Sequence, residues 1–346
     1  MIKAAINGFG RIGRVTFRNA LLHYRDEINI VAINNPGSMD AAGWAHMVRY
    51  DSVYGHFGKE IKVENKGQNE DEIGALVIDG VRYPILAQKE PAKIPWKNYG
   101  VEVVLEASGV FRSEEGAKGH LEAGAKKVII SAPEQGGNVG TFLIGVNQEK
   151  YTGQYDVISN ASCTTNCVAP VVKVMIANFG IKKGFLTTIH SYTSSQNLTD
   201  GSGKDLRRAR AAAVNIIPTT TGATIATAKA IPELTGIFDG LAMRVPVLNG
   251  SISDFTFLTD KETTVEEINE VFQKAAGDPH WQNILAVTDE PIVSSDIIGR
   301  SESAIVDLSF TRVVGGDLVK ILAWYDNEWG YASRLIEQAI AVGRQL

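Results

Sequence analysis

The chain has 346 residues, of which 44% are hydrophobic and 21% charged, and its formal net charge is -5. This balance excludes a disordered or collagen-like chain, and the acidic net charge argues against a dedicated nucleic-acid binder. At roughly 150 residues per domain, the length favours two domains. No apolar run approaches the ~18 residues of a membrane helix, and the first residues lack the features of a signal peptide. We therefore expect a cytoplasmic enzyme with no membrane partner and no dedicated nucleic-acid partner.

The first 35 residues predict one strand–helix–strand unit. Residues 2–7 and 28–33 are apolar runs typical of buried strands, and Ile12, Val15 and Leu22 lie between them near helical spacing. Such a unit usually begins an open parallel sheet.

Further short runs extend this sheet. Apolar residues 101–105, 128–130 and 142–146 predict strands, and a helix is expected from Ser113 as N-cap to Gly124. We interpret the charged residues 60–75 as a solvated excursion between strands.

Beyond about residue 160 the pattern changes. Longer runs with partial two-residue alternation predict a mostly antiparallel sheet, at 184–191, 241–247, 251–258 and 304–311. A capping box from Thr264 to Glu267 predicts a helix over 265–276, and residues 331–342 predict a final amphipathic helix.

Gly8, Gly10 and Gly13 form G-x-G-x-x-G between the first strand and its helix. Absent side chains there let a pyrophosphate approach backbone N–H groups at the positive end of the helix. A tight turn with no ligand is the alternative interpretation. An acidic residue that binds the ribose 2′-hydroxyl usually follows the second strand, but this chain has Asn35, which carries no charge to repel the 2′-phosphate of NADP. Asn35 could equally be a turn residue before Pro36.

The two cysteines, Cys163 and Cys167, lie in SNASCTTNC, too few and too close for a disulfide framework or a structural metal site. Cys163 is expected in the first turn of a helix, where the dipole and unpaired N–H groups lower the pKa of a thiol. Cys167 should be a small buried residue, and Pro170 should kink this helix or confine its regular part. Among the histidines, His190 ends a strand before the polar run Ser-Tyr-Thr-Ser-Ser. A Cys163–His190 nucleophile–base pair and a core cysteine with an unrelated histidine remain the two interpretations.

Several motifs together resemble phosphorylating glyceraldehyde-3-phosphate dehydrogenase over essentially the whole chain: NGFGRIGR, SNASCTTNC, TTIHSYT, DLRRARAA, NIIPTTTGA, MRVP and WYDNEWGY. The resemblance implies an α/β fold, with a Rossmann-type parallel-sheet domain and an α+β catalytic domain that has a mostly antiparallel sheet. It places the dinucleotide-binding domain at 1–161 and the catalytic domain at 162–328, with the helix at 329–346 returning to the first domain. It also implies a homotetramer that acts on glyceraldehyde 3-phosphate and inorganic phosphate.

The resemblance assigns roles residue by residue. Cys163 attacks the aldehyde, and His190 acts as its base. The residues implied to bind the substrate phosphate are Thr193, Arg208 and Arg244. Those implied to bind the incoming phosphate are Ser162, Thr164, Thr221 and Gly222. The residues implied to bind the cofactor are Gly8, Gly10, Arg11, Ile12, Gly13, Asn35, Lys89, Ser131, Ser202 and Asn327. No metal site is expected. Tyr331 is expected to pack against the nicotinamide or simply to face its own helix.

Two departures bear on the cofactor. Asn35 replaces the carboxylate common in NAD-specific members, and Gly201-Ser202 replaces a bulky Leu-Pro, as in the NADP-using chloroplast and cyanobacterial forms. Both favour use of NAD and NADP. The competing functions are erythrose-4-phosphate dehydrogenase, which shares the cysteine and histidine motifs, and a catalytically silent nucleotide- or RNA-binding scaffold.

Overall fold

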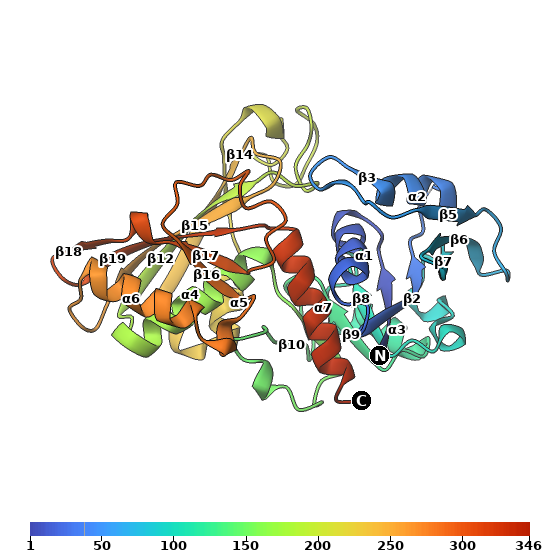
Figure 1. Cartoon of the computed structure of the whole chain (residues 1–346), viewed down its shortest axis with the longest axis horizontal. Helices are drawn as coiled ribbons and strands as arrows, with labels where there is room; N and C mark the ends of the chain where they lie inside the picture. Colours follow the sequence, from blue (N-terminus) through green and yellow to red (C-terminus); the bar gives the residue numbers. More distant parts are fainter. Residues whose placement is uncertain (38) are drawn as a thin grey trace. The chain divides into compact units, whose positions relative to one another are not determined.

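The computed structural model describes residues 1–37 and 39–346, and its contacts divide the chain into two compact units. Unit 1 comprises Met1–Phe142, Gln148–Ala161 and Ala332–Leu346, and unit 2 comprises Leu143–Asn147 and Ser162–Tyr331. The helices are α1 (Arg11–His23), α2 (Ala41–Arg49), α3 (Glu114–Glu122), α4 (Cys163–Phe179), α5 (Ala223–Ala230), α6 (Val265–Ala276) and α7 (Trp329–Gly343) (Figure 1).

Unit 1 contains a mostly parallel sheet. Its strands are β1 (Ile2–Asn7), β2 (Ile28–Asn34), β5 (Ile61–Glu64), β6 (Glu72–Ile78), β7 (Val81–Leu86), β8 (Val103–Glu106), β9 (Lys127–Ile130), β10 (Gly140–Thr141) and β11 (Val157–Ser159), and β3 (Tyr50–Asp51) pairs separately with β4 (Gly55–His56). The spatial order is β10-β11-β9-β8-β1-β2-β7-β6-β5, with antiparallel pairing confined to β5, β6 and β7. The chain passes from β1 to β2 on one side, while β8 lies on the other. The carboxyl ends of β1 and β8 therefore form the topological switch point at which such sheets bind ligands.

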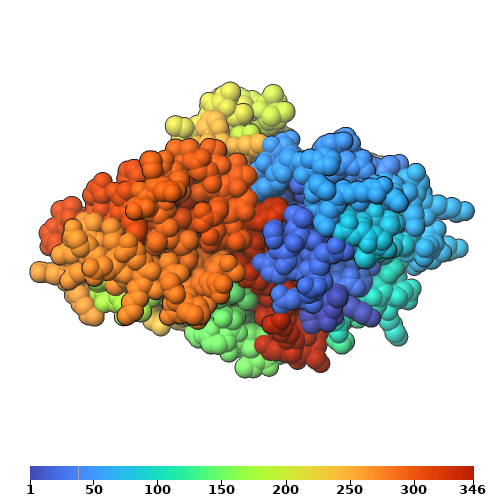
Figure 2. Space-filling view, in the orientation of Figure 1, coloured from blue at the N-terminus to red at the C-terminus, as the bar shows by residue number. Residues whose placement is uncertain are grey.

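The C-terminal helix belongs to the core of unit 1. Leu335 and Ile336 of α7 share one buried cluster with Ile6 of β1 and Phe17 of α1. Asn19 of α1 also donates from Nδ2 to Ser333 Oγ at 2.8 Å. Figure 2 shows the C-terminal residues in red beside the N-terminal ones in blue.

Unit 2 contains a mixed, mainly antiparallel sheet. Its strands are β12 (Lys183–Ser191), β13 (Ile217–Thr220), β14 (Phe238–Val245), β15 (Ser251–Leu258), β16 (Leu285–Thr288), β17 (Ala304–Asp307), β18 (Arg312–Val314) and β19 (Leu318–Tyr325). The order is β13-β14-β12-β15-β19-β17-β16, and β18 pairs with β19. β12 runs parallel to β14, so the side chains at the ends of these two strands meet at one edge of the sheet. The two sheets confirm the expected α/β fold class.

Helix ends follow the expected capping chemistry. The capping box between Thr264 and Glu267 opens α6 at its predicted first residue, and Ser113 caps α3 by accepting from Gly116 N–H at 3.1 Å. These predictions are confirmed. α4 continues through Pro170 as one helix, so the expected confinement of its regular part is wrong.

Three local predictions are also wrong. The strand expected at 142–146 is a turn, because Gly145 has a φ of 79° and Asn147 Oδ1 accepts from Leu143 N–H at 2.8 Å. The solvated excursion expected at 60–75 is limited to 65–71, because 61–64 belong to β5 and 72–75 to β6, where Arg82 pairs with the buried carboxylate of Glu72. Leu22 is exposed on α1.

Candidate active site

The start of α4 holds Cys163 in unit 2. Ser162 is the N-cap, and its Oγ accepts from the N–H of Thr165 at 3.1 Å, so Cys163 is the first helical residue. This capping fixes the direction of the Cys163 side chain at the N-terminus. Cys167, one turn later, is completely buried, as the sequence predicts.

The structure brings Cys163 and His190 together. Cys163 Sγ lies 3.4 Å from His190 Nε2, and His190 Nδ1 lies 2.7 Å from the carbonyl oxygen of Ser191. A carbonyl can only accept, and Arg244 Nη1, 3.0 Å from the same Nδ1, can only donate. The shorter contact to the carbonyl favours the tautomer with the proton of the neutral ring on Nδ1, which leaves Nε2 as an acceptor facing the sulfur. Such a thiol–imidazole contact is the arrangement in which a base activates a nucleophile.

The electrostatic environment differs from the sequence expectation. Burial raises the pKa of the Cys163 thiol, although Arg244 and the hydroxyl and N–H of Thr164 act in the opposite direction. The predicted lowering of this pKa by the helix N-terminus is therefore wrong, because desolvation outweighs it. Burial and the nearby Arg244 lower the pKa of His190 to about 3. The neutral thiol and neutral imidazole are favoured, and the thiol proton must pass to His190 for sulfur to attack.

Two arginines lie near this pair, and the charge of each lowers the pKa of His190. Arg244 is the register partner of His190 on the neighbouring strand and donates from Nη1 to Ser191 O at 3.0 Å. Its Nε is buried and has no hydrogen-bond partner among the residues that the structure describes. Arg208 donates from Nε to Thr219 Oγ1 at 2.8 Å. An unpaired buried guanidinium donor fits an oxyanion from outside the chain.

Of the remaining predicted anion ligands, Thr193, Thr221 and Gly222 lie outside helices and strands, and Thr164 lies in the first turn of α4. Thr221 Oγ1 accepts from Ala223 N–H at 3.1 Å at the start of α5, and a Cβ added to Gly222 would meet no atom within 4 Å. This helix end is therefore open. Thr193 Oγ1 is 2.9 Å from Ser195 Oγ, and Thr164 is buried.

Tyr325 is a site residue that the sequence analysis missed. Its hydroxyl lies 3.0 Å from Thr164 Oγ1 and 2.8 Å from Thr188 Oγ1, and its ring lies 6.0 Å from that of His190 with edge-to-face geometry. It therefore ties the start of α4 to β12. Its place in WYDNEWGY was the available signal, but nothing in the sequence pairs it with the two threonines.

Asn327 presents a defined hydrogen-bonding face. Its Oδ1 accepts from Ser191 Oγ at 3.0 Å, Gly250 N–H at 3.2 Å and Ser251 Oγ at 2.8 Å. The Nδ2 group is therefore oriented as the remaining donor, which suits a carbonyl oxygen of a ligand. Tyr331 is buried.

The glycine-rich turn of unit 1 is a separate candidate site. A Cβ at Gly8, whose φ is 94°, would lie 2.4 Å from Ser108 N, and a Cβ at Gly13 would lie 2.0 Å from Gly8 O. A Cβ at Gly10 would meet nothing within 4 Å, and the N-terminus of α1 has no side-chain cap. The turn borders a cleft of about 410 Å³ lined by Asn7, Gly8, Gly10, Asn35, Pro36, Gln88, Lys89, Ala107, Ser108, Val110 and Phe111. Backbone donors at an open helix end beside this cleft fit a dinucleotide.

The other predicted cofactor residues are divided between the units. Asn35 Oδ1 accepts from Phe9 N–H at 2.9 Å, while Arg11 turns its guanidinium to Asp51 and over the ring of Tyr54. Arg11 and Ile12 are the first two residues of α1. Ser131 follows β9, and Ser202 is exposed in unit 2.

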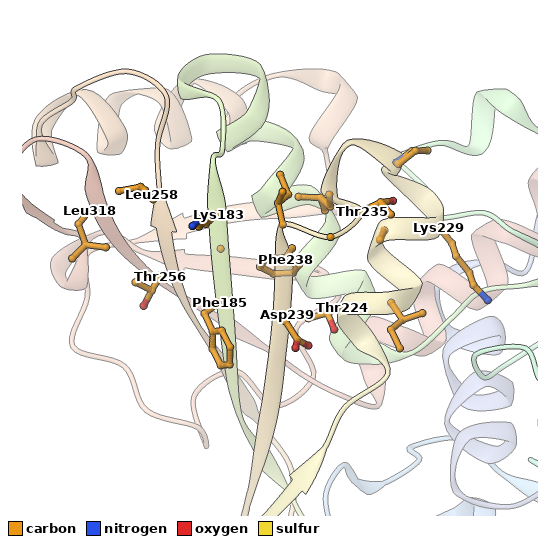
Figure 3. Close-up of a pocket in the computed structure, with 17 residues that line it drawn as sticks. Lys183, Phe185, Thr224, Lys229, Thr235, Phe238, Asp239, Thr256, Leu258 and Leu318 are labelled. Carbon is orange, nitrogen blue, oxygen red and sulfur yellow. The ribbon is translucent and has the colours of Figure 1, made fainter.

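A larger hollow lies elsewhere in unit 2. It has a volume of about 1100 Å³ and is lined by residues that include Phe185, Thr224, Ile225, Lys229 and Leu318, but neither Cys163 nor His190 (Figure 3). Over residues 1–37 and 39–346, no cluster of metal-ligating side chains is present, and no helix is long and apolar enough to cross a membrane.

Comparison with known proteins extends this picture. Residues 2–114 match the model of the glyceraldehyde 3-phosphate dehydrogenase NAD binding domain, and residues 162–327 match that of the C-terminal domain. The chain is 50% identical over 346 residues to a glyceraldehyde-3-phosphate dehydrogenase of Streptomyces coelicolor, covering 100% of this chain and 99% of the relative. It is 50% identical over 338 residues to that of Thermotoga maritima, covering 97% and 98%. It is 46% identical over 340 residues to a chloroplastic form of Arabidopsis thaliana, covering 98% and 83%.

Proposed function

Since the chain belongs to the glyceraldehyde-3-phosphate dehydrogenase family, we propose that Cys163 and His190 perform the family's reaction in this protein. The enzyme oxidises D-glyceraldehyde 3-phosphate and phosphorylates it reversibly to 1,3-bisphosphoglycerate. The 3.4 Å contact between Cys163 Sγ and His190 Nε2 carries the assignment of the two residues. The erythrose 4-phosphate alternative receives no support from the family models or from these relatives.

The reaction begins at sulfur. Cys163 Sγ adds to the aldehyde carbon, its proton passes to His190 Nε2, and that proton then moves to the former carbonyl oxygen to give a hemithioacetal. NAD, when bound, supplies the acceptor for the hydride that leaves this carbon. His190 takes the hydroxyl proton as the hydride departs, so that a thioester and an imidazolium result.

Phosphorolysis releases the product. A phosphate oxygen attacks the thioester carbon, the C–S bond breaks with its electrons going to sulfur, and the proton on His190 returns to sulfur. The proton of the incoming phosphate leaves to solvent. Two anions must be held during this step, and the guanidinium groups of Arg208 and Arg244 suit them. We assign Thr193, Arg208 and Arg244 to the substrate phosphate, and Ser162, Thr164, Thr221 and Gly222 to the incoming phosphate.

Replacing the thiol tests this assignment. Cys163→Ser should lower kcat by at least about 10^4-fold, because the alcohol is a much weaker nucleophile, while the Kd for NAD stays unchanged. Cys167→Ser is the matched control, since Cys167 is buried and has no role in the reaction. Turnover must also require inorganic phosphate. Substantial activity in Cys163→Ser would overturn the assignment. If the wild-type protein itself shows no activity, the catalytically silent scaffold is favoured.

NAD is the cofactor of the family, and we propose that this chain also uses NADP. Asn35 Oδ1 accepts a hydrogen bond from Phe9 N–H, and its Nδ2 is a donor. This amide can bind a ribose hydroxyl or a 2′-phosphate without charge repulsion. Ser202 can donate a second hydrogen bond. The proposed contacts of the cofactor are the backbone of Gly8, Gly10, Arg11, Ile12 and Gly13, and the side chains of Asn35, Lys89, Ser131, Ser202 and Asn327.

Steady-state kinetics with both cofactors test dual use. Asn35→Asp keeps the acceptor for Phe9 N–H and adds only charge, so kcat/KM for NADP should fall at least about tenfold while that for NAD does not. A wild-type kcat/KM more than about 100-fold higher for NAD than for NADP, ~2.7 kcal/mol, would contradict dual use.

We propose a cytoplasmic homotetramer whose chain comprises a dinucleotide-binding domain at 1–161, completed by 329–346, and a catalytic domain at 162–328. The contact-based units support this division, because α7 contributes to the core of unit 1. The apolar hollow of unit 2 supports an oligomer, since exposed apolar surface of this kind is commonly covered by another chain (Figure 3). Cell fractionation tests the location.

A further inference from the structure

A buried carboxylate lies at the switch point of the unit 1 sheet. Glu106 is the last residue of β8 and the register partner of Asn7, the last residue of β1. Its side chain is 1% exposed, although carboxylates are seldom fully buried unless paired. Asn7 and the two residues after Glu106, Ala107 and Ser108, line the cleft beside the glycine-rich turn.

Four donors converge on this carboxylate. Asn7 Nδ2 donates to Oε2 at 2.5 Å, and His120 Nε2 lies 3.0 Å from the same oxygen. Ser108 donates to Oε1 from its N–H at 2.8 Å and also from its hydroxyl. Since every neighbour can donate, Glu106 acts as an acceptor at both oxygens.

Trp96 fixes the histidine in this network. Its Nε1 lies 3.0 Å from His120 Nδ1, and an indole nitrogen can only donate. His120 Nδ1 must therefore accept, so the proton of the neutral ring lies on Nε2 and points to Glu106. Both His120 and Trp96 are completely buried, which leaves no water to replace these bonds.

The network reaches the walls of the cleft. Asn7 Oδ1 accepts from Asn34 Nδ2 at 2.7 Å, and Asn34 Oδ1 accepts from Gln88 N–H at 2.9 Å, next to Lys89. On the other side, the Ser108 N–H held by Glu106 is the atom that a Cβ at Gly8 would approach to 2.4 Å. One carboxylate therefore orients both strand ends that border the glycine-rich turn.

We propose that Glu106, held by His120 and Trp96, is the positioning residue that sets the affinity of unit 1 for its dinucleotide. It does not contact the reacting atoms. It fixes Asn7 and the backbone at Ser108 so that the glycine-rich turn stays open to a pyrophosphate. The inference rests on the proposed cofactor use and concerns this chain's affinity for NAD alone.

Calorimetric titration with NAD tests the proposal in the full-length protein. Glu106→Gln offers one acceptor where four donors converge, and its amide N–H opposes a second donor. We expect the Kd for NAD to rise at least tenfold and KM for NAD to rise with it, while kcat and KM for glyceraldehyde 3-phosphate change less than twofold. Glu72→Gln is the matched control, because Glu72 is a buried, hydrogen-bonded carboxylate of the same unit but, unlike Glu106, bonds to no residue that lines the cleft.

Trp96→Phe provides the test of the network. It removes the indole donor, so His120 can move its proton to Nδ1 and accept from the amide introduced by Glu106→Gln. The double variant Trp96→Phe/Glu106→Gln should therefore bind NAD at least threefold more tightly than Glu106→Gln alone, whereas Trp96→Phe by itself should weaken binding two- to fivefold.

Each outcome decides the question. Unchanged NAD affinity in folded Glu106→Gln overturns the inference, as does equal weakening in Glu72→Gln, which would indicate a general loss of stability. If Glu106→Gln does not fold, Trp96→Phe decides alone, and unchanged affinity in that variant overturns the proposal. A wild type that binds no NAD contradicts the proposed function and leaves no cofactor for the network to serve.

Discussion

The hydroxyl of Tyr325 connects the two segments that carry the nucleophile and its base. Burial raises the pKa of this phenol, so the proton stays on the hydroxyl that bonds to Thr164 and Thr188. Tyr325→Phe leaves two buried threonine hydroxyls without this partner. We expect a loss of about 1–2 kcal/mol in the free energy of unfolding and a fall in kcat/KM of between about 3- and 30-fold.

Tyr151→Phe is the control that distinguishes an effect of Tyr325 on the site from a general loss of stability. Tyr151 is also buried, and its hydroxyl donates to the carbonyl of Tyr155 at 3.2 Å in unit 1. Denaturant unfolding should report a similar loss of stability in both variants, whereas only Tyr325→Phe should lower kcat/KM. Equal kinetics in the two variants would reduce Tyr325 to a purely structural residue.

Arg244 affects the thiol through its charge. Burial raises the pKa of Cys163 and the Arg244 guanidinium lowers it in part, so removing that charge disfavours the thiolate. In Arg244→Met, the pH at which alkylation of Cys163 by neutral iodoacetamide is half-maximal should move to higher pH. Arg208→Met is the control, because Arg208 lowers the pKa of His190 and is not among the charges that act on Cys163. An equal midpoint in wild type and Arg244→Met would contradict this coupling.

At the scale of elements, two glycines of one turn should respond differently to the same substitution. A Cβ at Gly10 enters open space beside the cleft, so Gly10→Ala should fold normally and bind NAD at least about tenfold more weakly. A Cβ at Gly13 would lie 2.0 Å from Gly8 O, so Gly13→Ala must displace α1 from β1 and lower the free energy of unfolding by several kcal/mol. Thermal unfolding and NAD titration of the pair measure both effects. Normal NAD affinity in Gly10→Ala would exclude the turn from the cofactor site.

The sequence predicted a helix or strand correctly where all the residues that define it lie close together in the chain. The capping box at Thr264 contains every group that opens α6, and alternating apolar residues define β15. The turn at 142–146 escaped prediction because its four hydrophobic residues, interrupted only by Gly145, fit a strand pattern equally well. The strand β6 was missed because Glu72 is charged and was expected to be exposed to solvent. In the structure it is buried and pairs with Arg82, ten residues later.

The features of the candidate site likewise fall into those that the local sequence predicts and those that it does not. The glycine-rich turn and Cys163 could be found from the sequence, because a turn and a helix N-terminus are local structures. The Cys163–His190 contact joins residues 27 positions apart, and the bonds of Glu106 to Asn7 and of Tyr325 to Thr164 span 99 and 161 positions. Such pairings arise only when the sheets form, so composition and periodicity carry no information about them.

At the scale of the whole molecule, unit 2 presents a sheet with one covered face. Residues of β15 alternate between buried and half-buried along its length, and α4 packs against β15, β17 and β19. Phe185 lies on the open face, where its side chain is 48% exposed, beside the hollow that Ile225 and Leu318 also line. An antiparallel sheet can leave one face to water, but aromatic surface beside an apolar hollow is costly to expose.

A second copy of the chain is the occupant that the proposed homotetramer supplies for this face. Phe185→Glu would bury an unpaired carboxylate in such an interface, so the mass measured by light scattering should fall below that of four chains, 37.4 kDa each. Leu22→Glu is the control, because Leu22 is a similarly exposed apolar residue on α1 of unit 1. A mass that stays at four chains in Phe185→Glu would remove the open sheet face from the assembly and direct the search to the exposed apolar residues between Leu198 and Ile216.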